Sequence, residues 1–441
     1  MILSLRTFLK VSKNAGIFLA EARVTMRTSS YSATPPRNAR YINKLNKIAV
    51  LNLIRKTKNV SRAEVAKLSG LSAPTVSRIV EDLIKPGLVR EIGAGASQGG
   101  RRPTLLRFSD QNNFIIGVDL GTTNIYGVLS DFDAKIIAEI RRPTRVETGF
   151  ASIMKSTADV ISELMATPMG RKKRIFGIGM AVAGLINRTQ NVVEFSPDFH
   201  WHRVDVVGAL GQYHKVPIIF DNVTRIMALG EMWYGLGRQY RNLICVNVGY
   251  GIGAGIIIDG KPLYGPVGLA GEFGHITMDR HSRVLCECGN HGCLEALSSG
   301  NAIAKAAQAR LREETGAGAF RAACGGNGEA VTAEMVAHFA QLGDPLAYEI
   351  FDTAVEYLGI GIAGLINIFS PEAVVIGGGV AQAGDILFDK VRQTVNARAL
   401  NKISSNLVIK PASFGMKAAV MGAVSLILSE VVNFNHDARS A

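Results

Sequence analysis

The apolar positions between residues 41 and 84 recur every three or four residues, a spacing that is typical of short helices with one buried face. We expect a first helix that ends near Lys58. Ser61 and Glu64 have the spacing of a capping box and predict the start of a second helix. Ser72 is expected to cap a third helix. The buried faces of the first and third helices are predicted to be Ile42, Leu45, Ile48, Leu51 and Ile54, and Val76, Ile79, Val80 and Leu83.

A basic hairpin is expected to follow the third helix. Two runs with β-strand character, residues 88–92 and 104–108, flank a loop rich in Gly, Ala and Ser. Three helices and such a hairpin predict a winged helix-turn-helix domain over residues 41–108, with the third helix in the major groove and the wing near phosphates or the minor groove. The alternative is a small three-helix protein-interaction domain. The candidate DNA contacts are Thr75, Ser77 and Arg78 on the helix and Arg101 and Arg102 on the wing.

The charge of the chain is concentrated in its N-terminal quarter. The whole chain has a net charge of +13, but residues 1–108 hold 20 Lys and Arg against 5 Asp and Glu, so the remainder has a net charge of −2. This asymmetry is typical of a nucleic-acid or anionic-surface binder attached to a near-neutral body. Together with the winged domain, it favours DNA as the partner.

Length and composition limit the class of protein further. A chain of 441 residues, 47% of them hydrophobic, is expected to form two or three domains. Its most apolar stretches are interrupted by Asn and Gly before they reach eighteen residues, so no membrane insertion is expected. Residues 1–40 are predicted to be a basic, disordered leader, or upstream sequence if Met26 rather than Met1 is the true start.

Three segments beyond residue 108 run from an apolar strand into a glycine-rich turn: residues 114–129, 243–258 and 373–380. Backbone N–H groups and hydroxyls in such turns can cradle phosphate, and Asp119 is a candidate for holding a metal ion. Together they predict an α/β body of two similar lobes around a cleft, although each one alone could be only a tight turn. The candidate phosphate-turn residues are Asp119, Gly121, Thr122, Thr123, Gly249, Gly251 and Gly378.

Three of the five cysteines, Cys286, Cys288 and Cys293, crowd onto one short loop. Three thiolates and one imidazole make a closed tetrahedral site, which is the chemistry of structural zinc. The alternative is three reduced, buried cysteines. So few cysteines exclude a secreted disulfide scaffold, and a cytoplasmic location is expected. The candidates for the fourth ligand are His275, His281 and His291.

The body resembles the ROK family (repressors, open reading frames and sugar kinases) over roughly residues 41–430. With the winged domain in front, the chain is similar to the NagC/Mlc/XylR-type repressors, because the free-standing kinases of the family lack that domain. The motifs that carry the resemblance are the turn at residues 119–123, the segment 268–275, the cysteine loop 286–295 and the glycines 377–379.

The resemblance implies an actin-like, hexokinase-type fold with two ribonuclease H-like lobes. Lobe 1 is expected at residues 112–240, completed by a C-terminal helix at residues 416–432. Lobe 2, with the zinc loop, is expected at residues 241–415.

The resemblance also implies which residues meet a sugar and a metal. Glu272, His275 and Glu295 are expected to bond sugar hydroxyls, with Asn222 beside them. His275 is also the zinc ligand that the resemblance assigns. The metal loop and the sugar pocket are therefore expected to be mechanically tied.

Position 223 departs from the kinases of the family, which place a catalytic Asp directly after an Asn and eight residues before a Glu. Here Val223 follows Asn222 and precedes Glu231 by eight residues. A valine cannot accept the proton of a sugar hydroxyl, and general-base assistance is worth about 10² to 10⁴ in rate. Asp221 is not expected to replace the missing base.

Two further positions differ from the family pattern. Tyr250 stands where the kinases usually have Thr in the second phosphate turn, and Asp198 stands where the family tends to have a sugar-binding Asn. The first departure weakens the case for phosphoryl transfer, and the second leaves the identity of the ligand open.

These features predict a sugar-responsive DNA-binding regulator, a repressor of carbohydrate uptake or catabolism genes, that binds a sugar or sugar phosphate without phosphorylating it. Two protomers related by a two-fold axis match an inverted-repeat operator, so a dimer or tetramer is expected. Two alternatives stay open: an ATP-dependent sugar kinase with an accessory DNA-binding domain, and a regulator switched by a protein partner.

Overall fold

The structure is a computed structural model. It describes residues 39–434 apart from residues 58, 86, 96–101, 109–112, 173, 189, 267, 314–317, 326–329 and 401–405. The predicted leader up to residue 38, Arg101 in the predicted wing, and the side chains of Ile42, Leu45 and Ile48 lie outside the described residues.

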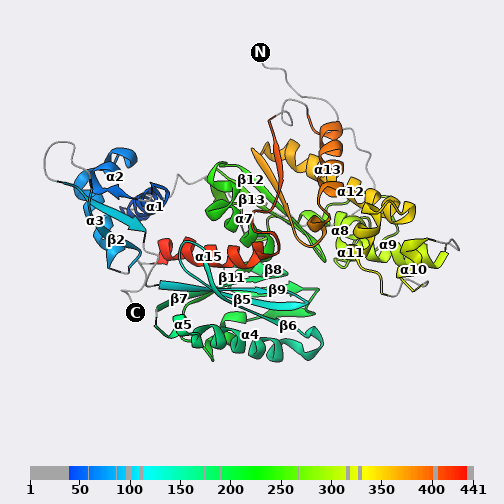
Figure 1. The fold of residues 1–441 in the computed structure, drawn as a ribbon, viewed down its shortest axis with the longest axis horizontal. Helices are drawn as coiled ribbons and strands as arrows, with labels where there is room; N and C mark the ends of the chain where they lie inside the picture. The colour runs from blue at the N-terminus through cyan, green and yellow to red at the C-terminus, as the bar shows by residue number, and fades with distance from the viewer. Residues whose placement is uncertain are drawn as a thin grey trace, which may run out of the picture. The chain divides into compact units, whose positions relative to one another are not determined.

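The chain from Ala39 to Phe108 forms the three expected helices and the two expected strands, and a short strand that was not expected makes the sheet three-stranded (Figure 1). The capping box is present, because the Ser61 hydroxyl accepts from the Glu64 N–H and the Glu64 carboxylate accepts from the Ser61 N–H at 2.8 Å. Ser72 caps the third helix. The elements are α1 (Ala39–Thr57), β1 (Val60–Ser61), α2 (Arg62–Ser69), α3 (Ala73–Ile84), β2 (Val89–Ala94) and β3 (Thr104–Phe108), with the strands in the order β1-β3-β2.

Lobe 1 is built on a five-stranded sheet with the order β11-β7-β4-β5-β6. Strand β4 is antiparallel to β5 and parallel to β7. Its side chains alternate between two cores: Ile116 packs in the core with helix α4, and Ile115 packs in the core with helix α15. The strands are β4 (Asn113–Leu120), β5 (Asn124–Ser130), β6 (Ile136–Pro143), β7 (Arg174–Val182) and β11 (Ile218–Asn222). The helices are α4 (Gly149–Ala166), α5 (Pro168–Lys172), α6 (Val206–Gly211) and α15 (Ala418–Phe434), with a 3-10 turn η1 (Val146–Thr148).

A small antiparallel sheet belongs to lobe 1 as well and has the order β10-β9-β8. Its strands are β8 (Leu185–Asn187), β9 (Val192–Ser196) and β10 (Trp201–Val204).

Lobe 2 repeats the arrangement of lobe 1 with a second five-stranded sheet in the order β14-β13-β12-β15-β16. Strand β12 is antiparallel to β13 and parallel to β15, as β4 is to β5 and β7. Its strands are β12 (Leu243–Val248), β13 (Ile252–Ile258), β14 (Lys261–Pro262), β15 (Ala373–Gly377) and β16 (Val408–Pro411). Its helices are α8 (Leu294–Ser298), α9 (Gly300–Glu313), α10 (Ala319–Ala323), α11 (Ala333–Gln341), α12 (Pro345–Phe369) and α13 (Asp385–Arg398). Its 3-10 turns are η3 (Phe273–His275) and η4 (Val380–Ala383), whereas η2 (Leu236–Arg238) follows α7 (Val223–Tyr234) and η5 (Gly415–Lys417) leads into α15.

Helix α7 (Val223–Tyr234) joins the two lobes. It contacts β11 and β7 of lobe 1, β12 and β13 of lobe 2, and runs against α15 (Figure 1). The two helices approach closely at Gly422, where a Cβ atom would lie only 2.0 Å from the Ile226 carbonyl oxygen. A larger residue at position 422 would push the helices apart.

The predicted fold, a winged helix-turn-helix followed by two similar α/β lobes, is confirmed. The C-terminal helix α15 lies against β4 and β7, so it completes lobe 1. Among the described residues, no helix is long and apolar enough to cross a membrane.

Candidate functional site

A cavity of about 340 Å³ is lined by residues from both lobes. Its size is at the lower end for small-molecule pockets and suits a ligand as small as a monosaccharide. The end of β11 supplies one lining residue, the loop and turn at η3 supply two, and the start of α8 supplies another. These four are the residues predicted to meet a sugar: Asn222, Glu272, His275 and Glu295.

Asn222 is fixed at the start of α7. Its Oδ1 accepts from the Thr224 N–H at 2.9 Å, and its Nδ2 donates to the Gly184 carbonyl at 3.0 Å. An amide has two N–H groups and two lone pairs, so one of each stays available to a ligand. The next residue, Val223, lines the same cavity with an apolar side chain.

The carboxylates of the cavity differ in their surroundings. Glu295 is oriented by the Ile252 N–H, which donates to its Oε2 at 2.7 Å. Burial raises the pKa of Glu272. Burial, followed by the charges of Glu287 and Glu295, raises the pKa of Asp198 to about 6. Carboxylates at fixed positions are strong acceptors for the hydroxyl protons of a sugar.

Asp221 cannot serve as a base in this cavity, because it is fully buried and does not line it. It binds Arg188 Nη1 at 2.9 Å and Arg225 Nε and Nη2 at 3.0 and 2.7 Å. The Arg188 guanidinium also lies over the Tyr264 ring, 4.1 Å from its centroid. Arg225 donates to the Ala270 carbonyl at 3.4 Å, so this network ties lobe 1 to the loop that carries Glu272.

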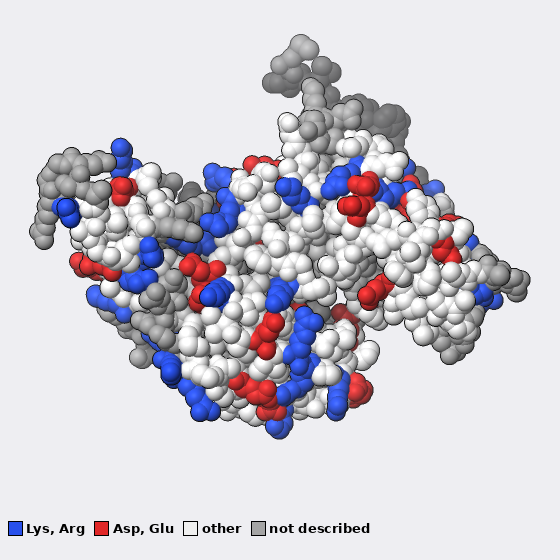
Figure 2. Space-filling model, in the orientation of Figure 1, with Lys and Arg blue, Asp and Glu red and all other residues white. Residues whose placement is uncertain are grey.

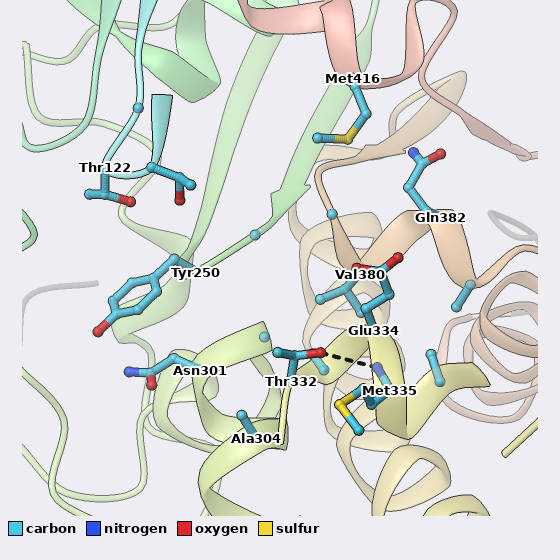
Figure 3. A pocket seen from close by; sticks show the side chains of 18 of the residues that line it. Thr122, Tyr250, Asn301, Ala304, Thr332, Glu334, Met335, Val380, Gln382 and Met416 are labelled. Carbon is cyan, nitrogen blue, oxygen red and sulfur yellow. Dashed lines mark hydrogen bonds between the residues drawn. The ribbon is translucent and has the colours of Figure 1, made fainter. Parts of the chain in front are cut away.

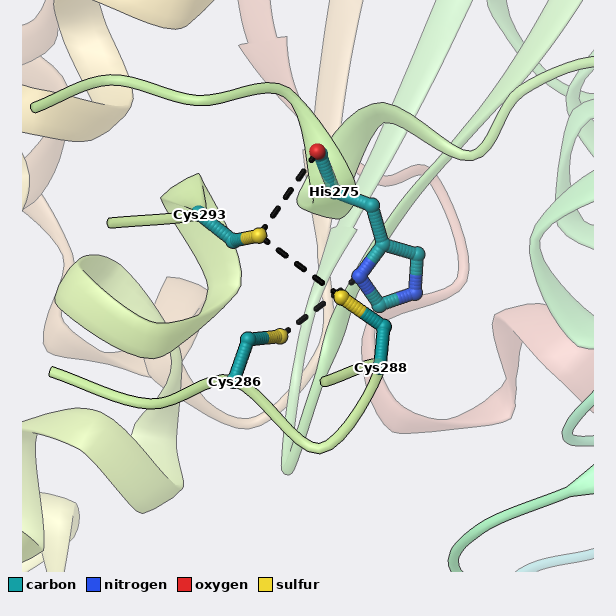
Figure 4. A group of neighbouring side chains, drawn as sticks. All are labelled: His275, Cys286, Cys288 and Cys293. Atoms are coloured by element: carbon teal, nitrogen blue, oxygen red, sulfur yellow. Dashed lines mark hydrogen bonds between the residues drawn. The ribbon is translucent and has the colours of Figure 1, made fainter. Parts of the chain in front are cut away.

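The four ligand atoms of His275, Cys286, Cys288 and Cys293 lie within 4.8 Å of one another and could hold a metal ion (Figure 4). The Cys286 Sγ is 3.6 Å from His275 Nδ1, and the sulfurs of Cys288 and Cys293 are 3.7 Å apart. His281 and His291, the competing candidates, are not part of this cluster.

The metal cluster is continuous with the smaller cavity. His275 and Cys288 belong to both, and Glu295 opens the helix that begins directly after Cys293. The metal cluster and the cavity therefore share two residues of this region.

A second cavity, of about 1110 Å³, holds most of the predicted phosphate turns. Thr122 and Tyr250 lie on one side of it, and Gln382 and Met416 on another (Figure 3). Burial raises the pKa of Asp119, which lines both cavities, to about 7, against the lowering effect of Arg141. Of the predicted residues, Asp119, Gly121, Thr122, Thr123 and Gly249 line the larger cavity, and Gly251 lines only the smaller one.

Gly378 was predicted to line the phosphate site and lines neither cavity; its neighbour Gly379 lines the larger one. Gly378 has φ +93°, and a Cβ atom there would lie 2.4 Å from the Val248 carbonyl oxygen. The residue is therefore a glycine because of backbone geometry and close packing.

The predicted DNA-contacting residues of α3 are not equally accessible. Arg78 is exposed, whereas Thr75 and Ser77 are half-buried, and the Thr75 hydroxyl is hydrogen-bonded to the Ser72 hydroxyl at 2.8 Å. Arg102 is exposed and lies two residues before β3. Over lobe 1, by contrast, basic and acidic side chains are interspersed on the face shown in Figure 2.

Sequence reasoning missed several residues of these cavities. Arg141, Asn301 and Glu334 line the larger cavity from β6, α9 and α11, and nothing in their local sequence marks them. The network around Asp221 was missed as well. The spacing of Asp221 and Arg225 is visible along the chain, but Arg188 is brought to them only by the fold.

The chain matches the model of the ROK family over residues 115–430 and a winged helix-turn-helix DNA-binding model over residues 44–90. It is 33% identical to the xylose repressor of Caldicellulosiruptor bescii over 90% of this chain and 98% of that protein. It is also 33% identical to a glucokinase of Thermotoga maritima, over 72% of this chain and 98% of the glucokinase.

A solved structure has the same architecture. It is described as a ROK family transcriptional regulator, a homologue of the E. coli Mlc protein, with a TM-score of 0.76 and 26% identity over 89% of this chain and 100% of that chain. The regulators thus match both parts of the chain, whereas the glucokinase is almost fully covered by 72% of it. The chain therefore belongs to the ROK family, in the branch of sugar-responsive repressors that bind DNA through an N-terminal winged helix-turn-helix.

Proposed function

We propose that this protein represses carbohydrate genes by binding operator DNA through its winged domain, and that a sugar bound between Asn222 and Glu295 releases it. The observation that carries the proposal is a cavity that combines amide and carboxylate side chains with the apolar Val223, which by the family resemblance stands where the kinases have their base. Such a cavity binds a sugar and does not turn it over. The name of the relatives makes xylose the first sugar to test.

In this proposal the sugar ring is held from both lobes. Asn222 offers one N–H and one lone pair from the start of α7, and Glu272 and Glu295 accept hydroxyl protons from lobe 2. Binding therefore favours one separation of the lobes over others. The sugar releases DNA only if it binds the DNA-incompetent arrangement more tightly, since equal affinity for both arrangements shifts nothing.

The metal is proposed to be structural zinc. Tetrahedral zinc with Zn–S of about 2.3 Å and Zn–N of about 2.0 Å separates its ligand atoms by roughly 3.5 to 3.8 Å. The observed distances of 3.6 and 3.7 Å fit this geometry, and three thiolates with one imidazole form a closed site. His275, Cys286, Cys288 and Cys293 would hold the ion and fix the loop that presents Glu272 to the sugar.

Helix α7 is the proposed connection from the sugar to the winged domain. It is capped by Asn222 and ends at Tyr234, beside Arg55 of α1. Arg55 donates to the Trp233 carbonyl at 3.1 Å and lies 4.1 Å above the Trp233 ring. A displacement at the sugar end of α7 is therefore transmitted to the helix that supports the DNA-reading helix.

Fluorescence anisotropy on full-length protein tests the function. An operator selected from random duplex DNA should bind tightly, and xylose or another sugar should weaken binding by about 5- to 150-fold. No sugar should be phosphorylated when ATP and Mg²⁺ are added, and Val223→Asp serves as the comparison. If DNA binding ignores every sugar, the proposal is wrong.

Two results would favour the alternatives. ATP-dependent phosphorylation by the wild type, little changed in Val223→Asp, would identify a kinase; the larger cavity with Asp119 and Thr122 is the feature that makes this worth testing. Release of the operator by a cell-extract protein, and not by sugars, would identify control by a protein partner. The size of the free and DNA-bound protein would establish whether it is a dimer or a tetramer.

A further inference from the structure

The charges that line the smaller cavity are almost all negative. Four carboxylic acids line it: Asp119, Asp198, Glu272 and Glu295. No lysine or arginine is among its lining residues in the described part of the chain, and the imidazole of His275 belongs to the metal cluster. If the cavity binds a sugar, as proposed, this negative charge selects among sugars by their own charge.

We infer that the cavity takes an unphosphorylated, uncharged sugar and excludes sugar phosphates and acidic sugars. The inference rests on the proposed function and deepens it. A phosphate monoester carries a charge of about −1.5 to −2 near pH 7 and needs Arg, Lys or several backbone N–H groups as partners. Beside several carboxylates in a partly buried cavity, it meets repulsion that bulk water does not screen.

The cations nearest to the cavity are already engaged. Arg188 and Arg225 both bind the fully buried Asp221, and Arg188 also lies over Tyr264. A phosphate could recruit either guanidinium only by leaving Asp221 buried and without its cations, which is costly. These arginines therefore do not serve as phosphate binders.

The contrast with the larger cavity supports the same inference. Arg141 lines the larger cavity and lies 4.4 Å above the Tyr126 ring. Asp119, Gly121, Thr122 and Tyr250 line both cavities, so the first predicted phosphate turn stands where the two meet. A sugar in the smaller cavity that pointed a phosphate toward Arg141 would bring it to this boundary, where the ionised form of Asp119 opposes the negative charge.

A neutral sugar meets none of these costs. Its hydroxyls donate to carboxylates and accept from the remaining Asn222 N–H, so each lining acid acts as a partner instead of a barrier. Asp198 lines the cavity and adds a negative charge that an amide of the same shape would not carry. It is therefore a specificity-determining residue.

Calorimetric titration of the full-length, metal-loaded protein tests the inference with matched pairs: xylose and xylose 1-phosphate, glucose and glucose 6-phosphate, N-acetylglucosamine and its 6-phosphate. The tightest ligand should be a free sugar, and its phosphate should bind at least 100-fold more weakly. Asp198→Asn should lower the ratio of free-sugar affinity to sugar-phosphate affinity at least fivefold. Asp159→Asn is the control and should not change the ratio, because Asp159 is a half-buried acid on α4 that pairs with Lys155 and does not line the cavity.

Each other result has a defined meaning. A phosphorylated sugar as the tightest ligand, or a ratio unchanged in Asp198→Asn, overturns the inference and leaves the regulator proposal standing. No binding by any of the six compounds, with a normal melting transition, overturns the proposed sugar site itself and the inference with it.

Discussion

The winged domain and the sugar cavity carry opposite charge, and each sign suits the partner proposed for that region. The N-terminal quarter has a large excess of Lys and Arg, with Arg78 and Arg102 exposed. The cavity is lined by carboxylates and by no described Lys or Arg. The winged domain therefore attracts phosphate groups, and the smaller cavity repels them.

The same kind of interaction, charge with phosphate, therefore distinguishes two ligands in one protein. DNA is recognised first through its phosphates, so a basic surface raises affinity for every sequence before any base is read. The cavity reads neutral hydroxyls, so negative charge adds acceptors and removes anionic competitors. Four changes test this division of labour.

The largest expected effect comes from the metal loop. Cys288→Ser removes a residue that belongs to both the metal cluster and the sugar cavity. We expect bound metal, measured by atomic emission, to fall from one per chain to none. The sugar concentration that releases the operator should rise more than about 100-fold, because the ligands position Glu272. DNA affinity without sugar should stay within a factor of three.

Cys324→Ser is the matched control, since Cys324 is buried among the helices of lobe 2 and is not part of the cluster. If the metal content of Cys288→Ser equals that of the wild type, the zinc proposal is wrong.

Arg78→Ala acts at the opposite end. It removes an exposed guanidinium from the middle of the predicted recognition helix. Operator affinity should fall by about 1–3 kcal/mol, or roughly 5- to 150-fold, with relaxed specificity at one base pair. Sugar affinity, measured by calorimetry, should not change.

Arg171→Ala is the control. It removes one positive charge as Arg78→Ala does, but from α5 of lobe 1 instead of α3. Equal losses of operator affinity in the two variants would mean that Arg78 contributes only general charge.

Arg55→Met tests whether the two regions communicate through α7. The change keeps much of the apolar stem and removes the cation over Trp233 together with the hydrogen bond to its carbonyl. A cation–π contact is worth about 0.5–2 kcal/mol, so the factor by which sugar weakens operator binding should fall by roughly 3- to 10-fold. Sugar affinity without DNA should stay within about threefold.

Arg310→Met removes an arginine that pairs with Glu349 on lobe 2 and serves as the control. If sugar weakens operator binding by the same factor in Arg55→Met as in the wild type, communication through Arg55 and α7 is excluded.

The smallest effect concerns pH. The pKa of Asp198 is raised to about 6, chiefly by burial, so its negative charge is lost as the pH falls through 6. The preference for a free sugar over its phosphate should therefore narrow a few-fold between pH 7.5 and 5.5. Phosphate monoesters also take up a proton near pH 6, which acts in the same direction.

Asp198→Asn separates the protonation of Asp198 from the protonation of the phosphate. Any pH dependence of the preference that remains in this variant comes from the phosphate. If wild type and Asp198→Asn have the same pH profile, the charge of Asp198 does not govern selectivity.

The local features of the chain could be predicted because they depend on short-range physics. Ser61 and Glu64 satisfy each other's backbone groups within one turn, and the cysteine loop brings its sulfurs together within eight residues. Gly378 could not be assigned in this way. Gly379 of the same turn lines the larger cavity, whereas the close approach of Val248 from another strand explains the glycine at position 378.

The winged domain and the two-lobed body follow from motifs and periodic patterns in the sequence, which also led us to expect the metal ligands and an absent base at Val223. Only the tertiary structure decided that four carboxylates line one cavity, that Arg188 and Arg225 are engaged by Asp221, and that Arg55 meets the end of α7. The reason is physical: the charge around a ligand depends on which side chains face the cavity and which ones neutralise each other, and distant segments settle that only on folding.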